Sequence, residues 1–481
     1  MDIPFVLMGL LAGAGLLIPS LDVALRGRMQ ASVARYVAFA ALLVAVGLVV
    51  GEAVTAGSVG FTAAAGVFRN DALGLFFSMV VLLVSILVVG ASFDYMRGDP
   101  NESVFYALLL FTALGMVLLA FAVDLLMIFV AWELMSLPTY VLAGFHKRSP
   151  LSNEAAVKYF VLGALSSGIL LYAISVMYGI TGTTNLEEVV RVFAEPLGPL
   201  APLSVLALTL FIAGFGLKLA AVPFHMWIPD TYQGAPPVVS TLLAAGTKKA
   251  GFVAAIRVFA VALVLFRVDW TTAFAVLAVL TMTVGNVAAL MQRSMTRLLA
   301  YSSIAQAGYI MIGLAVAPAS ELGLVGVMFH TLTHAIMKST AFIAVVAVGY
   351  RTLKYDLDSY NGLGRRMPYT ALSLAVALLA LTGVPPLNGF WSKLVLFTAA
   401  IDGQMAWLAV AGVLNSAFSL GYYAWIIKRM YMDEPRDIAP IGEPRTFVAV
   451  LIAATILIIA TGVYPTPIFD FAQRAVLQLG G

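Results

Sequence analysis

The sequence predicts an all-α membrane protein, and three observations lead to that fold class. Hydrophobic residues make up 62% of the 481 residues and charged residues only 11%, whereas a soluble domain carries about 25% charged residues. Apolar runs recur along the whole chain, each near the ~20 residues that cross a bilayer as a helix. Two of these runs contain prolines followed by polar residues, which predicts helices broken within the membrane.

Taken in order, the apolar runs predict about fourteen transmembrane helices. They are expected near residues 3–24, 33–50, 72–94, 103–121, 124–145, 154–180, 201–222, 236–266, 271–291, 297–316, 322–349, 368–400, 405–428 and 446–468. The expected organisation is an N-terminal three-helix segment (1–100), a first inverted repeat of spans 4–8 (101–266), a second of spans 9–13 (267–430) and a C-terminal helix (431–481).

Lysine and arginine are distributed unequally between the two sides of this arrangement. Sixteen fall in loops that follow odd-numbered spans, such as those of Lys147 and Arg365, and four fall on the opposite side. Because short basic loops stay in the cytoplasm, we expect a multi-pass protein of the inner (cytoplasmic) membrane with both termini outside.

Composition also restricts the chemistry. The chain has no cysteine, so it cannot ligate an iron–sulfur cluster through thiolates. It contains no GxGxxG and no Walker loop, so nothing indicates that it binds a nucleotide itself. We expect no cofactor in this chain, no metal and no nucleic-acid partner; its immediate surroundings are expected to be lipids.

Seven cations lie inside the predicted spans, namely Lys158, Lys218, Lys248, Lys249, Arg257, Lys338 and Lys393. A cation near the bilayer centre costs on the order of 2.5–3.5 kcal/mol on insertion scales. Snorkelling from a helix end is an alternative explanation for Arg257 and Lys249. Because Lys218, Lys338 and Lys393 lie well inside apolar runs, we interpret them as functional.

Each proline-containing span places a lysine close to its break. Lys218 precedes Pro223 in the seventh span, and Lys393 follows Pro385-Pro386 in the twelfth. Paired discontinuous helices at matching positions are typical of an inverted-repeat transporter whose ion site lies at the membrane midplane. A packing kink without function is the alternative, and two breaks beside buried lysines argue against it.

The fifth span supplies an acid. Glu133 is flanked by apolar residues on both sides, and a buried carboxylate either protonates or pairs with a cation. Lys218 is the natural partner. Burial lowers the pKa of a lysine in general and a nearby carboxylate raises it, so a change in their separation could load or release a proton.

The eleventh span carries His330, His334 and Lys338 at intervals of four residues, which places them along one face of a helix. Zinc binding is disfavoured because no glutamate lies between the histidines and the chain has no cysteine. A hydrated proton relay is the favoured interpretation, since histidine titrates near physiological pH. Structural hydrogen bonds between helices are the alternative.

Several motifs resemble the N-type, antiporter-like subunit of respiratory complex I. They are Ser152-Asn153-Glu154-Ala155-Ala156-Val157-Lys158-Tyr159-Phe160-Val161-Leu162-Gly163-Ala164, then Leu171-Tyr172 and Tyr178-Gly179, then Lys218 with Pro223-Phe224-His225-Met226-Trp227-Ile228-Pro229-Asp230, and Gly234-Ala235-Pro236 leading to Thr247-Lys248. The resemblance runs over almost the whole chain and is sharpest between residues 124 and 395. It is specific for the complex I and cation-antiporter superfamily.

The resemblance implies a pairing of Glu133 with Lys218, a central lysine at Lys248 and a terminal lysine at Lys393. Lys249, beside Lys248, is the alternative for the central position. The lysine at 393 argues against the M-type branch, whereas the His330/His334/Lys338 stripe is similar to the L-type subunit and the antiporters. An auxiliary relay is expected to include Lys158, His225, His330, His334 and Lys338.

The resulting hypothesis is a non-redox, proton-translocating subunit of a complex I-type quinone oxidoreductase. The resemblance implies neighbouring M-type and small K-type membrane subunits and a hydrophilic redox arm, with FMN, iron–sulfur clusters and quinone in those partners. The electron donor, whether NADH, ferredoxin or deazaflavin, is left open. A subunit of a multi-subunit Na+/H+ antiporter and a structural scaffold subunit are the alternatives.

Overall fold

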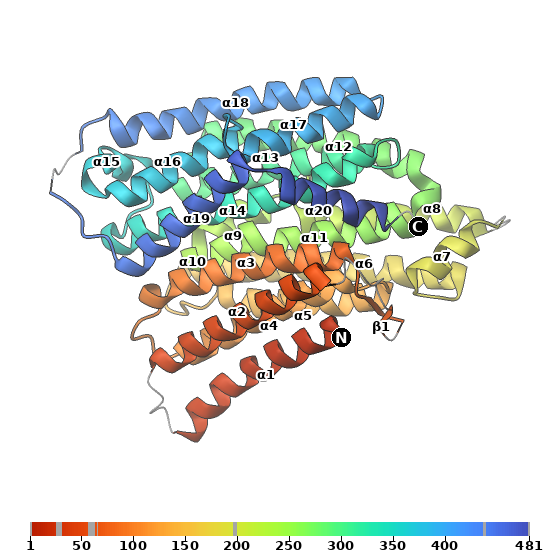
Figure 1. Cartoon of the computed structure of the whole chain (residues 1–481), viewed down its shortest axis with the longest axis horizontal. Helices are drawn as coiled ribbons and strands as arrows, with labels where there is room; N and C mark the ends of the chain where they lie inside the picture. The colour runs from red at the N-terminus through yellow and green to blue at the C-terminus, as the bar shows by residue number, and fades with distance from the viewer. Residues whose placement is uncertain are drawn as a thin grey trace.

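The computed structural model describes residues 2–25, 31–55, 63–64, 66–195, 200–435 and 439–479, and nearly all of them are helical. Figure 1 shows the long helices packed side by side, with the N-terminal helices along one edge and α18 along the other. The only strands in the described part are the short antiparallel pair β1 (Ala63–Ala64) and β2 (Phe68–Arg69). The all-α class is therefore confirmed.

Twelve helices of the described chain are long and apolar enough to cross a membrane in one piece. They are α1 (Ile3–Ala24), α2 (Ala31–Thr55), α3 (Ala72–Tyr95), α4 (Glu102–Phe121), α5 (Leu125–Ala143), α6 (Pro150–Thr181), α8 (Ala201–Leu219), α12 (Arg267–Leu290), α13 (Met295–Val316), α14 (Glu321–Thr352), α18 (Ala406–Tyr431) and α19 (Arg445–Val463). Each coincides with a predicted span. The eighth and twelfth predicted spans are absent from this set because both are interrupted.

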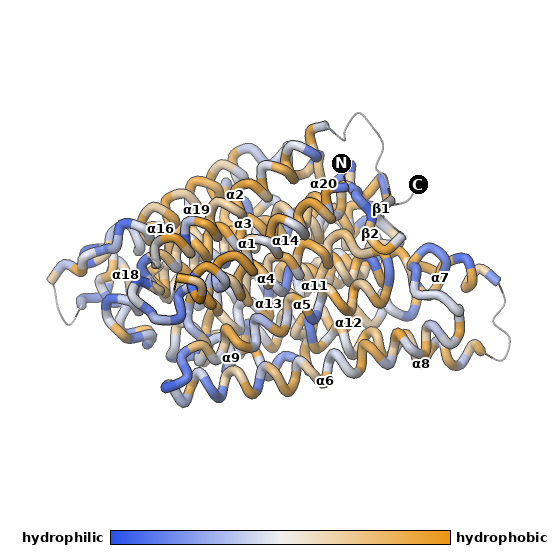
Figure 2. Tube along the Cα trace, turned by 90° about the horizontal axis from the view of Figure 1, so that it is seen from below, coloured by the Kyte–Doolittle hydropathy of each residue, from blue (hydrophilic) through white to orange (hydrophobic). Residues whose placement is uncertain are grey.

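The remaining elements are shorter. They are the helices α7 (Leu186–Phe193), α9 (Trp227–Gly234), α10 (Pro237–Leu242), α11 (Lys248–Ala255), α15 (Leu363–Arg366), α16 (Pro368–Thr382), α17 (Asn388–Asp402) and α20 (Thr466–Leu477), the π-helical turns η3 (Leu243–Thr247) and η4 (Ile256–Ala262), and the 3-10 turns η5 (Val264–Phe266) and η6 (Leu357–Tyr360). Hydrophobic residues dominate the length of the helices, and hydrophilic residues gather toward the ends of the bundle (Figure 2).

Two helices occupy the centre of the protein. The most apolar 18-residue window of α14 is entirely buried and that of α13 is 94% buried, whereas the windows of α1 and α19 are only 33% and 28% buried. Polar residues on α13 and α14 therefore face other helices of the same chain rather than lipid. This placement permits charges that a lipid-facing helix could not carry.

The two predicted helix breaks are both present. Helix α8 ends at Leu219 and α9 begins at Trp227, while α16 ends at Thr382 and α17 begins at Asn388. The residues that close α8 and α16, Ala220 and Gly383, have φ values of 56° and 98°, which turn the chain out of the right-handed helix. Proline follows within a few residues in both cases and prevents the helix from continuing.

The eighth span is interrupted in a way that the sequence did not predict. Helix α11 lies between the π-helical turns η3 and η4, and π turns are rare features that occur often at functional sites. Lys248 and Lys249 begin α11, directly after η3. The wider π turn thus lies immediately beside the two candidate central lysines.

Arg257 and Lys249 do not snorkel, so the alternative explanation for these two residues is wrong. Arg257, in η4, is 1% exposed and donates to both carboxylate oxygens of Asp71 at 2.7 and 2.8 Å and to the carbonyl of Ala120 at 2.8 Å. Lys249 is fully buried. An arginine that finds a carboxylate inside the protein has no need to reach the membrane surface. Among the basic loop residues counted above, Arg26, Arg28 and Arg436 lie outside the described residues.

Candidate functional site

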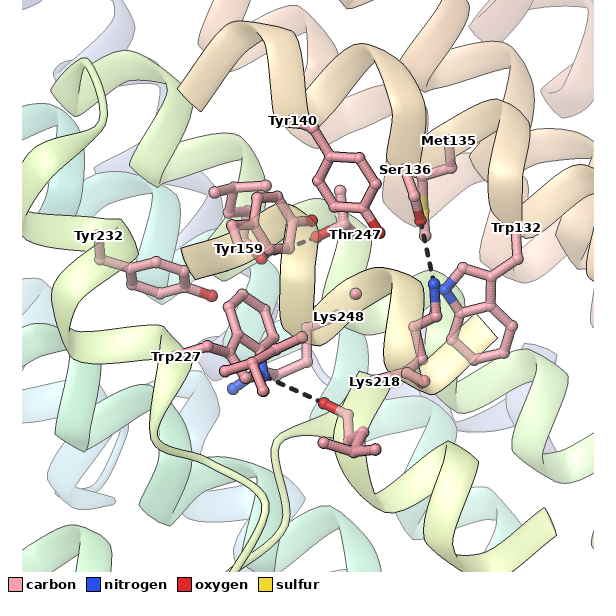
Figure 3. Close-up of a pocket in the computed structure, with 15 residues that line it drawn as sticks. Trp132, Met135, Ser136, Tyr140, Tyr159, Lys218, Trp227, Tyr232, Thr247 and Lys248 are labelled. Carbon is pink, nitrogen blue, oxygen red and sulfur yellow. Dashed lines mark hydrogen bonds between the residues drawn. The ribbon is translucent and has the colours of Figure 1, made fainter. Parts of the chain in front are cut away.

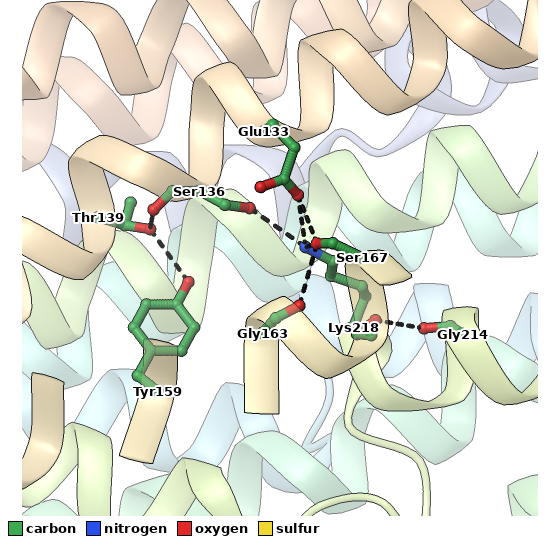
Figure 4. A network of polar contacts seen from close by, with 9 residues as sticks. Glu133, Ser136, Thr139, Tyr159, Gly163, Ser167, Gly214 and Lys218 are labelled. Atoms are coloured by element: carbon green, nitrogen blue, oxygen red, sulfur yellow. Dashed lines mark hydrogen bonds and ion pairs between the residues drawn. The ribbon is translucent and has the colours of Figure 1, made fainter. Parts of the chain in front are cut away.

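Glu133 and Lys218 form an ion pair between α5 and α8, as the sequence predicted. The Lys218 Nζ lies 3.2 Å from the Glu133 carboxylate and also donates to the hydroxyls of Ser167 at 3.0 Å and Ser136 at 3.4 Å. Ser167 donates to the same Glu133 oxygen at 2.5 Å. Figure 4 shows these groups converging from α5, α6 and α8. The lysine can therefore keep hydroxyl partners if the carboxylate moves away.

The break after α8 explains why Lys218 lies at this point. Lys218 occupies the last turn of α8, where the final carbonyls of a helix favour a cation. Trp227, at the start of α9, donates its indole N–H to the Leu217 carbonyl at 3.1 Å. The ammonium also lies 5.6 Å from the centre of the Trp132 ring, a cation–π distance. Trp227 thus connects the two halves of the broken helix, and Trp132 of α5 packs against the lysine ammonium.

A small cavity of about 30 Å³ extends between Lys218 and Lys248. Figure 3 shows both lysines among its lining, together with Tyr159, Trp227 and Tyr232. A cavity needs roughly 10–15 Å³ to hold one water molecule. The space between the first two lysines is therefore large enough for water and has polar groups on its walls.

Lys248, rather than Lys249, faces this cavity. The Lys248 Nζ donates to the Ser303 carbonyl at 3.2 Å and to the Ser303 hydroxyl at 3.4 Å. The Lys249 Nζ instead donates to the Ala244 carbonyl of the π turn at 3.3 Å. The geometry therefore favours Lys248 as the central lysine, whereas the Lys249 ammonium turns back to the π turn that precedes it.

Lys338 contacts Ser302 of α13, the residue next to Ser303. Ser302 accepts a hydrogen bond from the Lys338 Nζ at 2.7 Å, while Ser303 accepts from Lys248. Two consecutive serines on α13 thus contact lysines of two different helices, α11 and α14. Lys338 is fully buried, and the Ser302 hydroxyl is its hydrogen-bond partner among the described residues.

His330 connects α14 with α13 and α17. Its Nε2 lies 3.0 Å from the Gln306 side-chain oxygen, and its Nδ1 lies 2.9 Å from the Ser392 hydroxyl. Gln306 donates through Nε2 to the Leu381 carbonyl at 3.1 Å. With that amide orientation its oxygen faces His330, so a neutral His330 donates through Nε2 and accepts from Ser392 at Nδ1.

His334 stacks on His330, with ring centres 5.9 Å apart and planes 3° from parallel. Neither of its ring nitrogens has a hydrogen-bond partner among the described residues, although His334 is fully buried. His330 and His334 therefore lie next to each other on α14, but the hydrogen bonds of His330 and Lys338 go to residues of other helices.

Lys393 lies at the second break. Its Nζ donates to the carbonyls of Leu381 and Thr382 at 2.9 and 3.0 Å and to the Ser416 hydroxyl at 2.7 Å. The Tyr309 ring centre is 4.5 Å away. Both carbonyls belong to the end of α16, which the break leaves without helical donors. The second broken helix thus uses its free carbonyls to hold a lysine.

Two of the expected auxiliary residues lie apart from these contacts. The Lys158 side chain is 42% exposed and pairs with Glu154 and Asp230 at 2.6 Å each, and Asp230 also pairs with Arg297 at 2.7 Å. His225 lies in the break between α8 and α9, and its Nδ1 has no partner among the described residues. Lys158 therefore belongs to an ion-pair cluster of α6, α9 and α13 and not to the buried row.

Sequence reasoning missed the hydroxyl partners. Each of six serines contacts at least one of the titratable side chains; they are Ser136, Ser167, Ser302, Ser303, Ser392 and Ser416. The adjacent pairs Ser166-Ser167 and Ser302-Ser303, each inside a transmembrane helix, were the signals available, since two polar residues in a row cannot both face lipid.

The arrangement places titratable side chains in a row through the protein. Titratable groups recur from Glu133 through Lys218, Lys248, Lys338 and His330 to Lys393, each with a hydroxyl, carbonyl or amide partner. Buried polar groups of this kind in a membrane mark ion or proton pathways.

Comparisons with known proteins agree with this reading of the fold. The family described as NADH:quinone oxidoreductase/Mrp antiporter, TM, matches residues 122–419. The chain is 45% identical to F420H2 dehydrogenase subunit N of Methanosarcina mazei over 88% of its length and 87% of that protein. It is 42% identical to NADH-quinone oxidoreductase subunit N of Trichlorobacter lovleyi over 84% of each chain.

Solved structures give the same result. A chain of respiratory complex I from Thermus thermophilus aligns with a TM-score of 0.81 and 32% identity, covering 96% of this chain and 98% of that one. A chain of the Mrp complex from Dietzia aligns with a TM-score of 0.89 over 100% and 98%, but at 23% identity it shows a shared fold alone. This chain belongs to the NADH:quinone oxidoreductase/Mrp antiporter transmembrane family.

Proposed function

We propose that this chain is the N-type, proton-translocating membrane-arm subunit of a complex I-type quinone oxidoreductase. The observation that carries the proposal is the buried row of lysines, in which Lys218, Lys248, Lys338 and Lys393 all have hydroxyl or carbonyl partners from other helices. The names of the two curated relatives, both subunit N of a dehydrogenase or oxidoreductase, support it.

The proposed route begins with a proton from the cytoplasm at the Glu133–Lys218 pair. It passes through the cavity to Lys248, then by way of Lys338 and His330 to Lys393, and leaves on the outer side. Ser302 and Ser303 support the middle of the route because they contact Lys338 and Lys248. His225, His334 and Lys158 are proposed as auxiliary groups, with Lys158 acting at the surface.

In this proposal the chain is a translocase subunit that carries out no redox chemistry. FMN, iron–sulfur clusters and quinone belong to partner subunits in a hydrophilic arm, and M-type and small K-type subunits are its membrane neighbours. Support comes from the absence of cysteine in the sequence, which removes thiolate ligation of a cluster.

The proposed location is the inner (cytoplasmic) membrane with both termini outside. The chain is naturally free of cysteine, so single cysteines introduced at Lys147 and Arg365 report the side of each loop. We expect both to react with a membrane-impermeant thiol reagent only from the cytoplasmic face. Labelling from the outer face would overturn the orientation.

Purification of the native assembly tests the function. An affinity tag on this chain is expected to recover other membrane subunits together with a hydrophilic arm that shows flavin and iron–sulfur absorbance. NADH and F420H2, the donors named in the two curated relatives, are then offered to the purified complex. In proteoliposomes, oxidation of the accepted donor should be accompanied by proton translocation.

A Na+/H+ antiporter subunit is the competing function. It predicts an assembly without redox absorbance and cation exchange without any electron donor. A scaffold subunit predicts instead that substitutions in the lysine row leave proton translocation unchanged. The purification and the variants described below therefore separate all three functions.

A further inference from the structure

The two helix breaks have different hydrogen-bond partners. At the first break the Trp227 indole of α9 donates to the Leu217 carbonyl of α8, so the two halves of the broken helix contact each other. At the second break the Trp391 indole of α17 donates to the Gly462 carbonyl of α19 at 2.8 Å. That carbonyl is among the final ones of α19, which have no donor within the helix. The start of α17 is therefore attached to a separate helix.

A second hydrogen bond joins the same two helices. Asn388, the first residue of α17, is fully buried and donates its side-chain N–H to the Thr461 hydroxyl of α19 at 3.0 Å. Thr461 donates its own O–H to the Leu457 carbonyl at 2.6 Å, so its oxygen acts as the acceptor for Asn388. The side-chain oxygen of Asn388 has no partner among the described residues. Within that part of the chain, the side chain of Asn388 is therefore held by Thr461.

Gly462 brings the backbone of α19 against the break itself. A Cβ at this position would meet the Pro386 carbonyl and would lie 2.7 Å from the backbone nitrogen of Asn388, so a larger residue would push the two segments apart. Helix α19 has no titratable residue after Arg445. Its contact with the break can therefore act on a proton route only by fixing the position of other groups.

The segment that α19 holds carries two groups of the proposed route. Lys393 follows Asn388 on α17, and its Nζ donates back to two carbonyls at the end of α16. Ser392, beside it, lies 2.9 Å from His330 Nδ1. Because the two carbonyls belong to the other half of the broken helix, a shift of α17 relative to α16 would change the hydrogen bonds of Lys393.

We propose that Asn388 is a positioning residue for Lys393, and that Thr461 and Gly462 of α19 hold Asn388 in place. This inference rests on the proposed function, because it assigns a role within the same proton route. Tyr309 of α13 and His330 of α14 also face Lys393, and both remain when α19 is changed. The position of the last lysine then depends on a helix that contributes no titratable side chain to the route.

Thr455 supplies a matched control on the same helix. Like Thr461 it is a partly buried threonine of α19, but its hydroxyl has no hydrogen-bond partner among the described residues. Valine keeps the size and shape of threonine and lacks the hydroxyl. Thr461→Val therefore leaves the Asn388 amide without its acceptor inside the protein, whereas Thr455→Val removes no hydrogen bond of the described structure.

The test measures proton translocation per assembled complex, across a range of pH, in the purified complex. Thr461→Val is expected to lower the rate about five- to tenfold, as for one lost buried hydrogen bond. It should also move the half-maximal pH by about half a unit or more, because the partners of Lys393 change. Thr461→Ser keeps the acceptor and should behave as the unmodified protein, and Thr455→Val should change neither quantity. Equal losses in the two valine variants, or less assembled complex with a normal rate and pH profile, would overturn the inference.

A double-mutant cycle shows whether the two residues act through their mutual hydrogen bond. Asn388→Leu removes the donor and should lower the rate by about the same factor as Thr461→Val. The double variant Asn388→Leu/Thr461→Val should lose no more than either single variant, because the bond is already absent in each. Losses that multiply in the double variant would show that the residues act independently and would contradict the proposal.

Lys393→Met separates this inference from the proposed function. Most translocation should be lost in that variant, and unchanged translocation would refute the proposed function itself. If Lys393→Met loses translocation while Thr461→Val keeps the normal rate and pH profile, only the positioning role of Asn388 and α19 is refuted.

Discussion

Removal of the Asp71 carboxylate should destabilise the protein strongly, because it leaves a buried guanidinium without a counterion. Arg257 is 1% exposed, and two of its nitrogens donate to the two Asp71 oxygens at 2.7 and 2.8 Å. Within the described part of the chain, its bond to the Ala120 carbonyl is the one that would remain. The pair joins the start of α3 to the π turn η4, so it connects the N-terminal helices to the helix that carries Lys248.

The magnitude follows from two separate losses. Breaking a buried ion pair by removing one partner costs about 3–5 kcal/mol. Asp71 is also the N-cap of α3 and accepts from the Gly74 N–H at 2.8 Å, and losing such a cap costs about 1 kcal/mol. Asp71→Ala should therefore cost about 4–6 kcal/mol. Asp71→Asn keeps an oxygen for the cap and should cost about 3–5 kcal/mol.

Denaturant unfolding of the purified chain in detergent, followed by circular dichroism, measures these free energies. Arg257→Met and the double variant Asp71→Asn/Arg257→Met complete a double-mutant cycle. The double variant should be more stable than Asp71→Asn alone, because no unpaired charge is left inside the protein. Single variants that both lie within about 1 kcal/mol of the unmodified protein would refute the reasoning.

Three predictions concern the lysine row. Lys218→Ala should assemble but lose proton translocation, because Glu133 is left without a cation and protonates. Lys218→Arg should not restore translocation because guanidinium stays charged in this pH range. Full translocation by either variant would contradict the role of Lys218. Lys393→Glu should retain partial translocation whereas Lys393→Met loses most of it, and equal rates would make Lys393 structural. Gly389→Ala places a Cβ against the Ala380 carbonyl, so it should push α17 from α16 and lower translocation without removing a titratable group; unchanged translocation would show that the close approach is dispensable.

The spans and both helix breaks could be predicted because each depends on local sequence. Length and hydropathy determine where a helix crosses, and proline ends a helix wherever it lies. The Glu133–Lys218 pair could also be predicted, since few carboxylates lie inside apolar runs and each needs a partner.

Contacts between distant residues could not be predicted in this way. Snorkelling stayed open as an alternative for Arg257 because its partner, Asp71, is 186 positions earlier in the chain, and nothing near either residue indicates the other. The serines that contact the lysines are equally hard to predict from the sequence, because a serine within a transmembrane helix commonly hydrogen-bonds to its own helix backbone. Spacing of four placed His330, His334 and Lys338 on one face correctly, yet it could not show that the hydrogen bonds of His330 and Lys338 lead to α13 and α17.

The partners of the four lysines differ in a way that bears on where control is exerted. Among the described residues, Lys218 alone of the four has a carboxylate within hydrogen-bond distance, whereas Lys248, Lys338 and Lys393 have hydroxyl and carbonyl acceptors. Neutral acceptors stabilise a buried charge less than a carboxylate does. The first lysine therefore holds its proton through Glu133, whose side chain is 23% exposed on the surface of this chain. In the proposed function, a neighbouring subunit that contacts this exposed side of Glu133 changes its separation from Lys218, and so acts on the protonation of the first lysine.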